Sequence, residues 1–120
     1  MRVLIVDDEP DVLNLFATFF ASLGHNVLTA ENGCKALEAI DRDATVDAVL
    51  LDVMMPGIDG MNVLKDIQQR EPHPAVVMMT ARADERIFEA LRLGAVDYVL
   101  KPLDLIALDT TLNAAVQHPK

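Results

Sequence analysis

Val3-Leu4-Ile5-Val6-Asp7-Asp8-Glu9-Pro10 is the stretch that decides the fold. Four apolar residues end in an acidic pair, and Pro10 stands where a first helical turn tolerates its missing N–H. A short apolar run that leads directly into a helical pattern is typical of a βα unit in a parallel sheet. The first ten residues therefore predict a buried strand, a polar loop at its carboxyl end and the start of a helix.

The same alternation recurs along the whole chain. Predicted strands occupy residues 2–6, 26–30, 48–51, 75–79 and 96–100, and helical patterns lie between and after them, the last two over about 84–93 and 103–116. Four of these strands are nearly unbroken apolar runs, which favours helices on both faces, whereas 26–30 is more polar, as an edge strand is. Short connections between parallel strands predict a flavodoxin-like, doubly wound (βα)5 α/β fold with strand order 2-1-3-4-5.

Length and charge restrict the possible classes of function. The chain has 120 residues, so a single domain over 1–120 is expected, with no second domain. Its formal charge of −9 argues against direct nucleic-acid binding, which depends on Lys and Arg at phosphates. No apolar run approaches the ~18 residues that a membrane span needs. A soluble cytoplasmic protein is the expectation.

Several individual residues carry plainer expectations. The first helix is predicted to bury an apolar stripe of Val12, Leu15, Phe16, Phe19, Phe20 and Leu23, and to end at Gly24. Cys34, the single cysteine, is expected to be a small, partly buried residue without a partner for a disulfide. The three histidines are expected to be solvated surface residues: His25, His73 and His118.

Chemically active side chains follow four of the apolar runs. They are Asp7 and Asp8, Asp52, Thr80, and Lys101. The carboxyl ends of parallel strands share one edge of a sheet, so these side chains are expected to meet in one cleft. Three carboxylates suit Mg²⁺, with Mn²⁺ as a substitute, and an ammonium suits a phosphate. A metal-dependent phosphate site is predicted, in which an Asp carboxylate accepts a phosphoryl group.

Each of these residues also has a plainer interpretation. An acidic pair after a strand can cap the next helix, Thr80 can cap the helix that follows it, and Lys101 can be a solvated side chain. Ala81, beside Thr80, is small and leaves room for a phosphodonor. The joint pattern, rather than any one residue, favours the phosphate site.

Six segments carry a resemblance to a known family. They are Val6-Asp7-Asp8-Glu9-Pro10, Leu51-Asp52-Val53-Met54-Met55-Pro56-Gly57-Ile58-Asp59-Gly60, Met79-Thr80-Ala81, Leu100-Lys101-Pro102, Asn32-Gly33-Cys34-Lys35-Ala36-Leu37 and Gly94-Ala95-Val96-Asp97-Tyr98. In this order and spacing they resemble the response-regulator receiver domain of bacterial two-component signalling, within the CheY-like superfamily. The resemblance spans the whole chain.

The resemblance implies a role for each matching residue. Asp52 is expected to be the phosphoacceptor, and Lys101 to contact the phosphoryl group. Asp7 and Asp8, with Asp52 and the backbone carbonyl of Met54, are expected to hold Mg²⁺. Thr80 is expected to be the switch hydroxyl and Tyr98 the aromatic that changes rotamer with it. The Lys101–Pro102 bond is expected to be cis, and Gly60 to be structural.

Rates and partners are implied as well. Met54, Arg82 and Ala81 are expected to modulate access of water to the acyl phosphate, and an apolar Met54 to lengthen its lifetime. The phosphoryl group is expected to come from a sensor histidine kinase, a histidine phosphotransfer protein or a small phosphodonor. Residues 84–117 are expected to contact an output domain or partner protein. The domain is not expected to be an enzyme beyond its own phosphorylation and dephosphorylation.

Three other classes compete with this interpretation. A degenerate receiver acting as an interaction scaffold would share the same motifs. A haloacid-dehalogenase-like phosphohydrolase would need a second Asp two residues after Asp52, where this chain has Met54. A flavodoxin-type cofactor binder would need a Gly-, Ser- or Thr-rich loop after the first strand, and residues 7–11 are mostly acidic.

Overall fold

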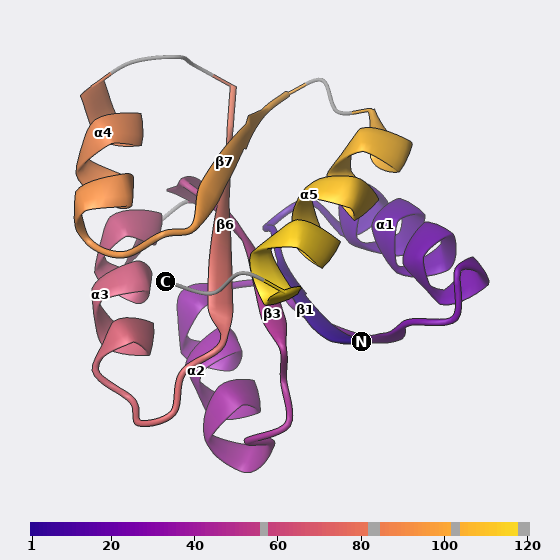
Figure 1. Ribbon diagram of the computed structural model, residues 1–120, viewed down its shortest axis with the longest axis horizontal. Helices are drawn as coiled ribbons and strands as arrows, with labels where there is room; N and C mark the ends of the chain where they lie inside the picture. Colours follow the sequence, from indigo (N-terminus) through magenta and orange to yellow (C-terminus); the bar gives the residue numbers. More distant parts are fainter. Residues whose placement is uncertain (56–57, 82–84, 102–103, 118–120) are drawn as a thin grey trace.

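A computed structural model describes residues 1–55, 58–81, 85–101 and 104–117 (Figure 1). The elements in chain order are β1 (Arg2–Val6), α1 (Pro10–Ser22), β2 (Asn26–Ala30), α2 (Gly33–Arg42), β3 (Ala48–Asp52), β4 (Met54–Met55), β5 (Ile58–Asp59), α3 (Gly60–Gln68), β6 (Ala75–Thr80), α4 (Glu85–Arg92), β7 (Asp97–Leu100) and α5 (Leu105–Gln117).

The main sheet is parallel and confirms the predicted fold class. Its strand order is β2-β1-β3-β6-β7, which corresponds to 2-1-3-4-5 among the predicted strands. Val6 pairs with Leu51, Asp52 with Met79 and Thr80 with Leu100, so the carboxyl ends of the central strands lie at one level. This register brings the residues that follow those strands to one edge.

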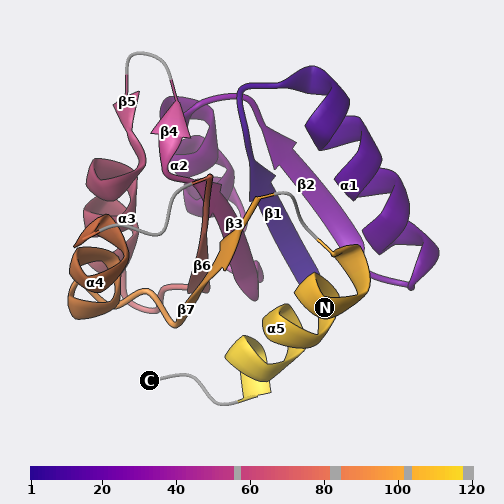
Figure 2. The same ribbon diagram turned by 90° about the horizontal axis from the view of Figure 1, so that it is seen from above.

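Helices cover both faces of the sheet (Figures 1 and 2). Helices α1 and α5 lie on one face, and α2, α3 and α4 lie on the other. Side chains alternate between two cores: Val49 and Leu51 of β3 pack in the core with α2 and α3, whereas Ala48 and Leu50 pack in the core with α1 and α5. This two-sided burial explains why the central strands read as unbroken apolar runs.

The last strand of the sheet departs from the expectation. Residues 96–100 form a nearly unbroken apolar run in sequence, yet β7 begins at Asp97 and is largely exposed, with Tyr98 and Leu100 at the surface. It is the terminal strand of the sheet, and among the described residues it pairs with β6 alone. The prediction that it is covered on both faces is wrong, because an edge position and the short helix α4 leave its outer residues uncovered.

A short hairpin follows β3 that the sequence analysis does not predict. Strands β4 and β5 pair antiparallel, Met54 with Asp59 and Met55 with Ile58. Two-residue strands carry no periodic signal, which is why the pattern analysis misses them. The hairpin returns the chain from the end of β3 to the start of α3.

The apolar stripe of α1 is partly wrong. Phe16 and Phe20 are buried and Phe19 packs beside them, but Leu15 and Leu23 are 57% and 48% exposed. Leu13 is partly buried in their place. Gly24 ends the helix with φ of +90°, as predicted.

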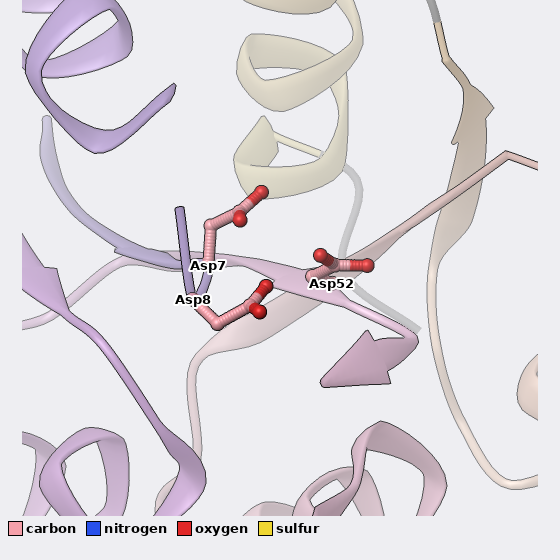
Figure 3. A group of neighbouring side chains, drawn as sticks. All are labelled: Asp7, Asp8 and Asp52. Carbon is pink, nitrogen blue, oxygen red and sulfur yellow. The ribbon is translucent and has the colours of Figure 1, made fainter. Parts of the chain in front are cut away.

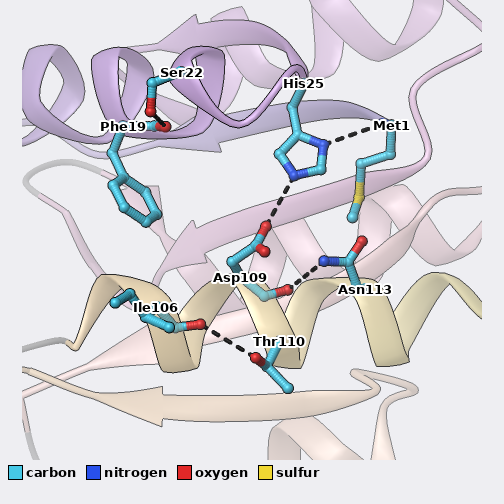
Figure 4. Close-up of polar contacts among 8 residues, drawn as sticks. All are labelled: Met1, Phe19, Ser22, His25, Ile106, Asp109, Thr110 and Asn113. Carbon is cyan, nitrogen blue, oxygen red and sulfur yellow. Dashed lines mark hydrogen bonds and ion pairs between the residues drawn. The ribbon is translucent and has the colours of Figure 1, made fainter.

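His25 is not a solvated residue. Its Nε2 lies 2.9 Å from Asp109 Oδ1 on α5, and its Nδ1 lies 3.1 Å from the amino group of Met1 (Figure 4). The ring is half-buried and joins the α1–β2 turn to α5. The prediction fails because the partner lies 84 residues away along the chain, beyond any local pattern.

Two further expectations have simple outcomes. Cys34 is exposed rather than partly buried, because α2 turns Ala36 and Ile40 toward the sheet and Cys34 away from it. His73 is exposed as expected, and His118 lies outside the described residues. In the part of the chain that the structure describes, no helix combines the length and apolar character needed to cross a bilayer.

Candidate functional site

The site lies at the carboxyl edge of the central strands. Asp7 directly follows β1, Asp52 is the last residue of β3 and Lys101 directly follows β7. Apolar burial fixes β1 and β3 in the middle of the sheet, and the chain becomes polar at the point where each of them leaves the two cores. The strands therefore act as a rigid support for the polar residues at their ends.

Three carboxylates meet at this edge. Asp7, Asp8 and Asp52 each offer an oxygen, and these oxygens all lie within 4.8 Å of one another (Figure 3). Asp7 is fully buried and Asp52 is 3% exposed, whereas Asp8 is more open to solvent. Like charges held this close and this deeply repel one another unless cations neutralise them. Hard carboxylate oxygens are the ligands that Mg²⁺ prefers, so the donor set fits that ion.

Lys101 supplies a cation from the neighbouring part of the edge. Its Nζ lies 3.2 Å from Asp52 Oδ2 and 3.3 Å from Asp7 Oδ2. Burial lowers the pKa of the Lys101 ammonium, but the carboxylates of Asp52 and Asp7 outweigh it, and the net pKa is raised above the ordinary lysine value. Lys101 is therefore charged at neutral pH, and its stabilising contribution is lost only when the pH rises through that raised value.

Backbone contacts hold Asp7 in place. The Glu9 N–H donates to Asp7 Oδ1 at 3.0 Å, and the Asp7 N–H donates to the carbonyl of Ala30 at 3.2 Å. One oxygen of Asp7 thus faces the loop backbone while the other faces Lys101. The carboxylate is oriented from both sides.

Gly60 holds the end of β3 by close approach. Its N–H donates to the carbonyl of Val53 at 3.1 Å. A Cβ at this position would stand 2.5 Å from the backbone carbonyl oxygen of Asp52. No residue with a side chain fits there unless the backbone moves, so Gly60 is structural in a specific sense: it lets the start of α3 rest on the segment that carries Asp52.

Thr80 and Tyr98 lie on neighbouring strands, and their side chains lie on the same face of the sheet. Thr80 is the last residue of β6, is 7% exposed, and its carbonyl accepts the Lys101 N–H at 2.8 Å. Met78 pairs with Tyr98 and Thr80 with Leu100, so Thr80 and Tyr98 project on the α4 face of the sheet. Tyr98 is 36% exposed, and Ala81, directly after Thr80, is exposed.

Some predicted site residues fall outside the described part of the chain. Arg82 and Pro102 are among them, so the expected cis bond before Pro102 stays a prediction. The backbone of Met54 belongs to β4, but its side chain is not described. The roles assigned to Met54 and Arg82 therefore stay predictions too.

One residue next to the site has a function that the sequence analysis misses. Asp59 Oδ1 accepts the Met61 N–H at 2.9 Å and caps α3, and its Oδ2 lies 3.3 Å from Arg86 on α4. The capping role had a visible signal, since an Asp directly before a helical pattern is a preferred N-cap. The contact with Arg86 had none, because it joins residues 27 positions apart.

The fold and this edge together define a class of protein. Together with the similarity to known proteins, they are those of a phosphoacceptor signalling module rather than of a conventional enzyme. The family model for the response regulator receiver domain matches residues 3–113, and the chain belongs to that family.

Individual relatives agree with this assignment. The chain is 44% identical over 117 residues to the regulatory protein AtoC of Escherichia coli, and 39% identical over 117 residues to the transcriptional regulatory protein ZraR of the same organism. Each match covers 97% of this chain and 25% or 26% of the relative, so the chain spans about a quarter of their length. The crystal structure of the receiver domain of NtrX from Brucella abortus matches with a TM-score of 0.88 at 33% identity, covering 96% of this chain and 98% of that one.

Proposed function

We propose that residues 1–120 form a single receiver domain that acts as a phosphorylation-dependent switch, with Asp52 as the phosphoacceptor. One observation carries the proposal: a nearly buried Asp52 carboxylate lies among two further carboxylates and pairs with the Lys101 ammonium at 3.2 Å. Of the three acids, Asp52 is the one that belongs to a strand, and that strand, β3, is central and buried along its whole length. Membership of the receiver family supports the same assignment.

The proposed reaction transfers a phosphoryl group to oxygen. A carboxylate oxygen of Asp52 attacks the phosphorus of a phosphohistidine or of acetyl phosphate. A new O–P bond forms as the bond from phosphorus to the leaving group breaks, and the leaving group takes the bonding electrons. Such transfer depends mainly on alignment and on neutralising charge, rather than on acid–base groups.

The residues around Asp52 divide these tasks. Asp7, Asp8, Asp52 and the Met54 carbonyl would hold Mg²⁺, which neutralises charge on the phosphoryl oxygens when bound. The Lys101 ammonium, already beside Asp52, contributes a second positive charge. The small side chain of Ala81 leaves an approach for the phosphodonor.

Thr80 and Lys101 would couple phosphorylation of Asp52 to a change of conformation elsewhere in the domain. A phosphoryl group on Asp52 adds charge and strong acceptor oxygens. It would draw the Thr80 hydroxyl and the Lys101 ammonium toward it, and Tyr98, on the same face as Thr80, would turn inward. The phosphorylated domain then favours a second conformation of α4, β7 and α5.

The proposed partners lie upstream and downstream of this change. A sensor histidine kinase or a histidine phosphotransfer protein would supply the phosphoryl group. The α4–β7–α5 surface would contact an output domain or a partner protein. Two relatives are regulators about four times as long as this chain, and one is named a transcriptional regulatory protein, which supports a role in controlling transcription.

Intact mass after incubation with acetyl phosphate and Mg²⁺ tests the phosphoacceptor. The wild type is expected to gain one phosphoryl group, and Asp52→Asn to gain none, because its amide is not a nucleophile of this kind. Asp11→Asn, which alters an exposed acid near the site, is the matched control and is expected to behave as the wild type. If the wild type takes no phosphoryl group while it binds Mg²⁺, the chain is an interaction scaffold instead.

A further inference from the structure

Helix α4 is lightly anchored compared with its neighbour α3. Of the residues that the structure describes in the two helices, α4 buries Ile87 and Ala90, whereas α3 buries five. Phe88, in the middle of α4, is 75% exposed. Little apolar surface therefore holds α4 in place, and the polar contacts at its ends carry a larger share of its position.

Among the described residues, polar contacts join α3 and α4 near both ends of α4. At the carboxyl end, Gln68 Nε2 donates to the carbonyl of Leu93 at 3.3 Å. The same amide fills the space where Gly94 lacks a Cβ, since a Cβ there would stand 1.9 Å from Gln68 Nε2. At the amino end, Arg86 lies 3.3 Å from Asp59 Oδ2. Helix α4 is thus held against α3 at both ends.

The Asp59–Arg86 contact at the amino end of α4 is also connected, through the backbone, to Asp52, the proposed phosphoacceptor. Asp59 is the N-cap of α3, and the next residue is Gly60, which hydrogen-bonds Val53 and rests on the carbonyl of Asp52. A shift of the backbone at Asp52 is therefore transmitted to Asp59 through tightly packed backbone rather than through flexible side chains. From Asp59 it reaches α4 through Arg86.

We propose that the Asp59–Arg86 ion pair is a latch between the phosphoacceptor segment and α4, and that Arg86 positions α4 in the unphosphorylated state. The regulatory part of this inference rests on the proposed function of Asp52. Both side chains are more than a third exposed, so the pair is weak by itself. A weak latch is what a reversible switch needs, since a small change at Asp52 is enough to release it.

Hydrogen exchange of the α4 amides, without phosphodonor, tests the latch. Arg86→Gln and Asp59→Asn are the informative variants, because Asn still caps α3 while it removes the charge that faces Arg86. Each is expected to speed exchange over Glu85–Arg92 by about twofold to fivefold, the range for an exposed pair. The double variant is expected to exchange no faster than either single one, and Arg86→Lys to retain part of the protection.

Two comparisons separate the latch from a general loss of structure. Arg92→Gln, which alters an exposed arginine in the last turn of the same helix, is expected to leave exchange in α4 unchanged. Exchange in α1 and α2 is expected to be the same in all variants. Addition of beryllofluoride and Mg²⁺, which imitate the phosphoryl group, is expected to speed α4 exchange in the wild type more than in Arg86→Gln, where the latch is already open.

The outcomes distinguish the latch from the phosphoacceptor. Unchanged α4 exchange in Arg86→Gln, or additive effects of the two substitutions, would overturn the latch. Intact mass with acetyl phosphate, measured on the same samples, reports on Asp52 independently. A protein that takes up phosphate normally while α4 ignores both substitutions retains the proposed function and loses the latch.

Discussion

The centre of the sheet, at β3, and its flank, formed by β7 and α4, differ in how deeply their residues are buried. Every residue of β3 is buried, and both of its faces are covered by helices. In β7 three of the four residues are exposed, and the adjacent α4 contributes two buried side chains among the described residues. The phosphoacceptor candidate Asp52 stands on the first region, and Tyr98 stands on the second.

This difference suits two different tasks. Phosphoryl transfer needs side chains held to within a fraction of an ångström, and buried strands provide that rigidity. A readout surface needs to change shape at a small cost in free energy, and lightly packed elements provide that. On the proposed function, the rigid region would carry the chemistry and the lightly packed region the response, with β6 as the single strand between β3 and β7.

The largest expected effect compares two leucines. Leu50 is fully buried in β3, and Leu100 is 43% exposed in β7. Leu50→Ala leaves a cavity and is expected to lower the free energy of unfolding by about 3 kcal/mol. Leu100→Ala is expected to lower it by less than about 1 kcal/mol. Urea unfolding of both variants gives the two values, and equal losses would show that the flank is as firmly packed as the centre.

Two glycines, one against the end of β3 and one in the exposed turn after α1, give a smaller contrast. Gly60→Ala places a Cβ against the backbone of Asp52 and Val53 and is expected to cost about 2 kcal/mol, in the range of overpacked sites. Gly24→Ala meets no atom within 4 Å, and its cost is the strain of φ +90°, about 1 kcal/mol. Thermal unfolding measures both. Gly60→Ala is also expected to slow phosphorylation of Asp52, while Gly24→Ala is not, and equal rates would contradict the proposed role of Gly60.

The smallest expected effect is electrostatic. Lys101→Met removes the ammonium that lies beside Asp7 and Asp52, leaving the three carboxylates without that competing cation. Affinity for Mg²⁺ is expected to rise by up to about tenfold, or ~1.4 kcal/mol. Lys65→Met, at an exposed position on α3, is the control. Isothermal titration with Mg²⁺ measures the change, and a weaker affinity in Lys101→Met would mean that Lys101 does not oppose metal binding.

The sequence allows the parallel sheet and the meeting of its strand ends to be predicted, because both follow from local patterns. The apolar runs that end in Asp52 and in Thr80 each predict a buried strand from local sequence alone. Right-handed crossovers make these strands parallel, so their carboxyl ends lie at the same edge of the sheet. Asp7, Asp8, Asp52 and Lys101 do lie at one edge in the structure. The roles of these residues in phosphoryl transfer stay predictions until Asp52→Asn is tested.

Contacts between residues that are distant in the sequence cannot be predicted from local patterns. His25 pairs with Asp109, and Asp59 with Arg86, and nothing in either local sequence indicates the partner. Exposure of Leu15 and of β7 was also missed, because an apolar residue looks the same in sequence whether a helix covers it or not. Such features depend on which elements stand at the edges of the fold.

Tyr98 gives the molecule an optical property. The chain has one tyrosine and no tryptophan, and that tyrosine lies part-exposed on β7 at the flank described above. All tyrosine emission of the protein therefore comes from a single position on the proposed readout surface. Quenching of this emission by a water-soluble quencher measures the solvent exposure of Tyr98 directly. Changes in the exposure of β7 can therefore be followed in real time without a label.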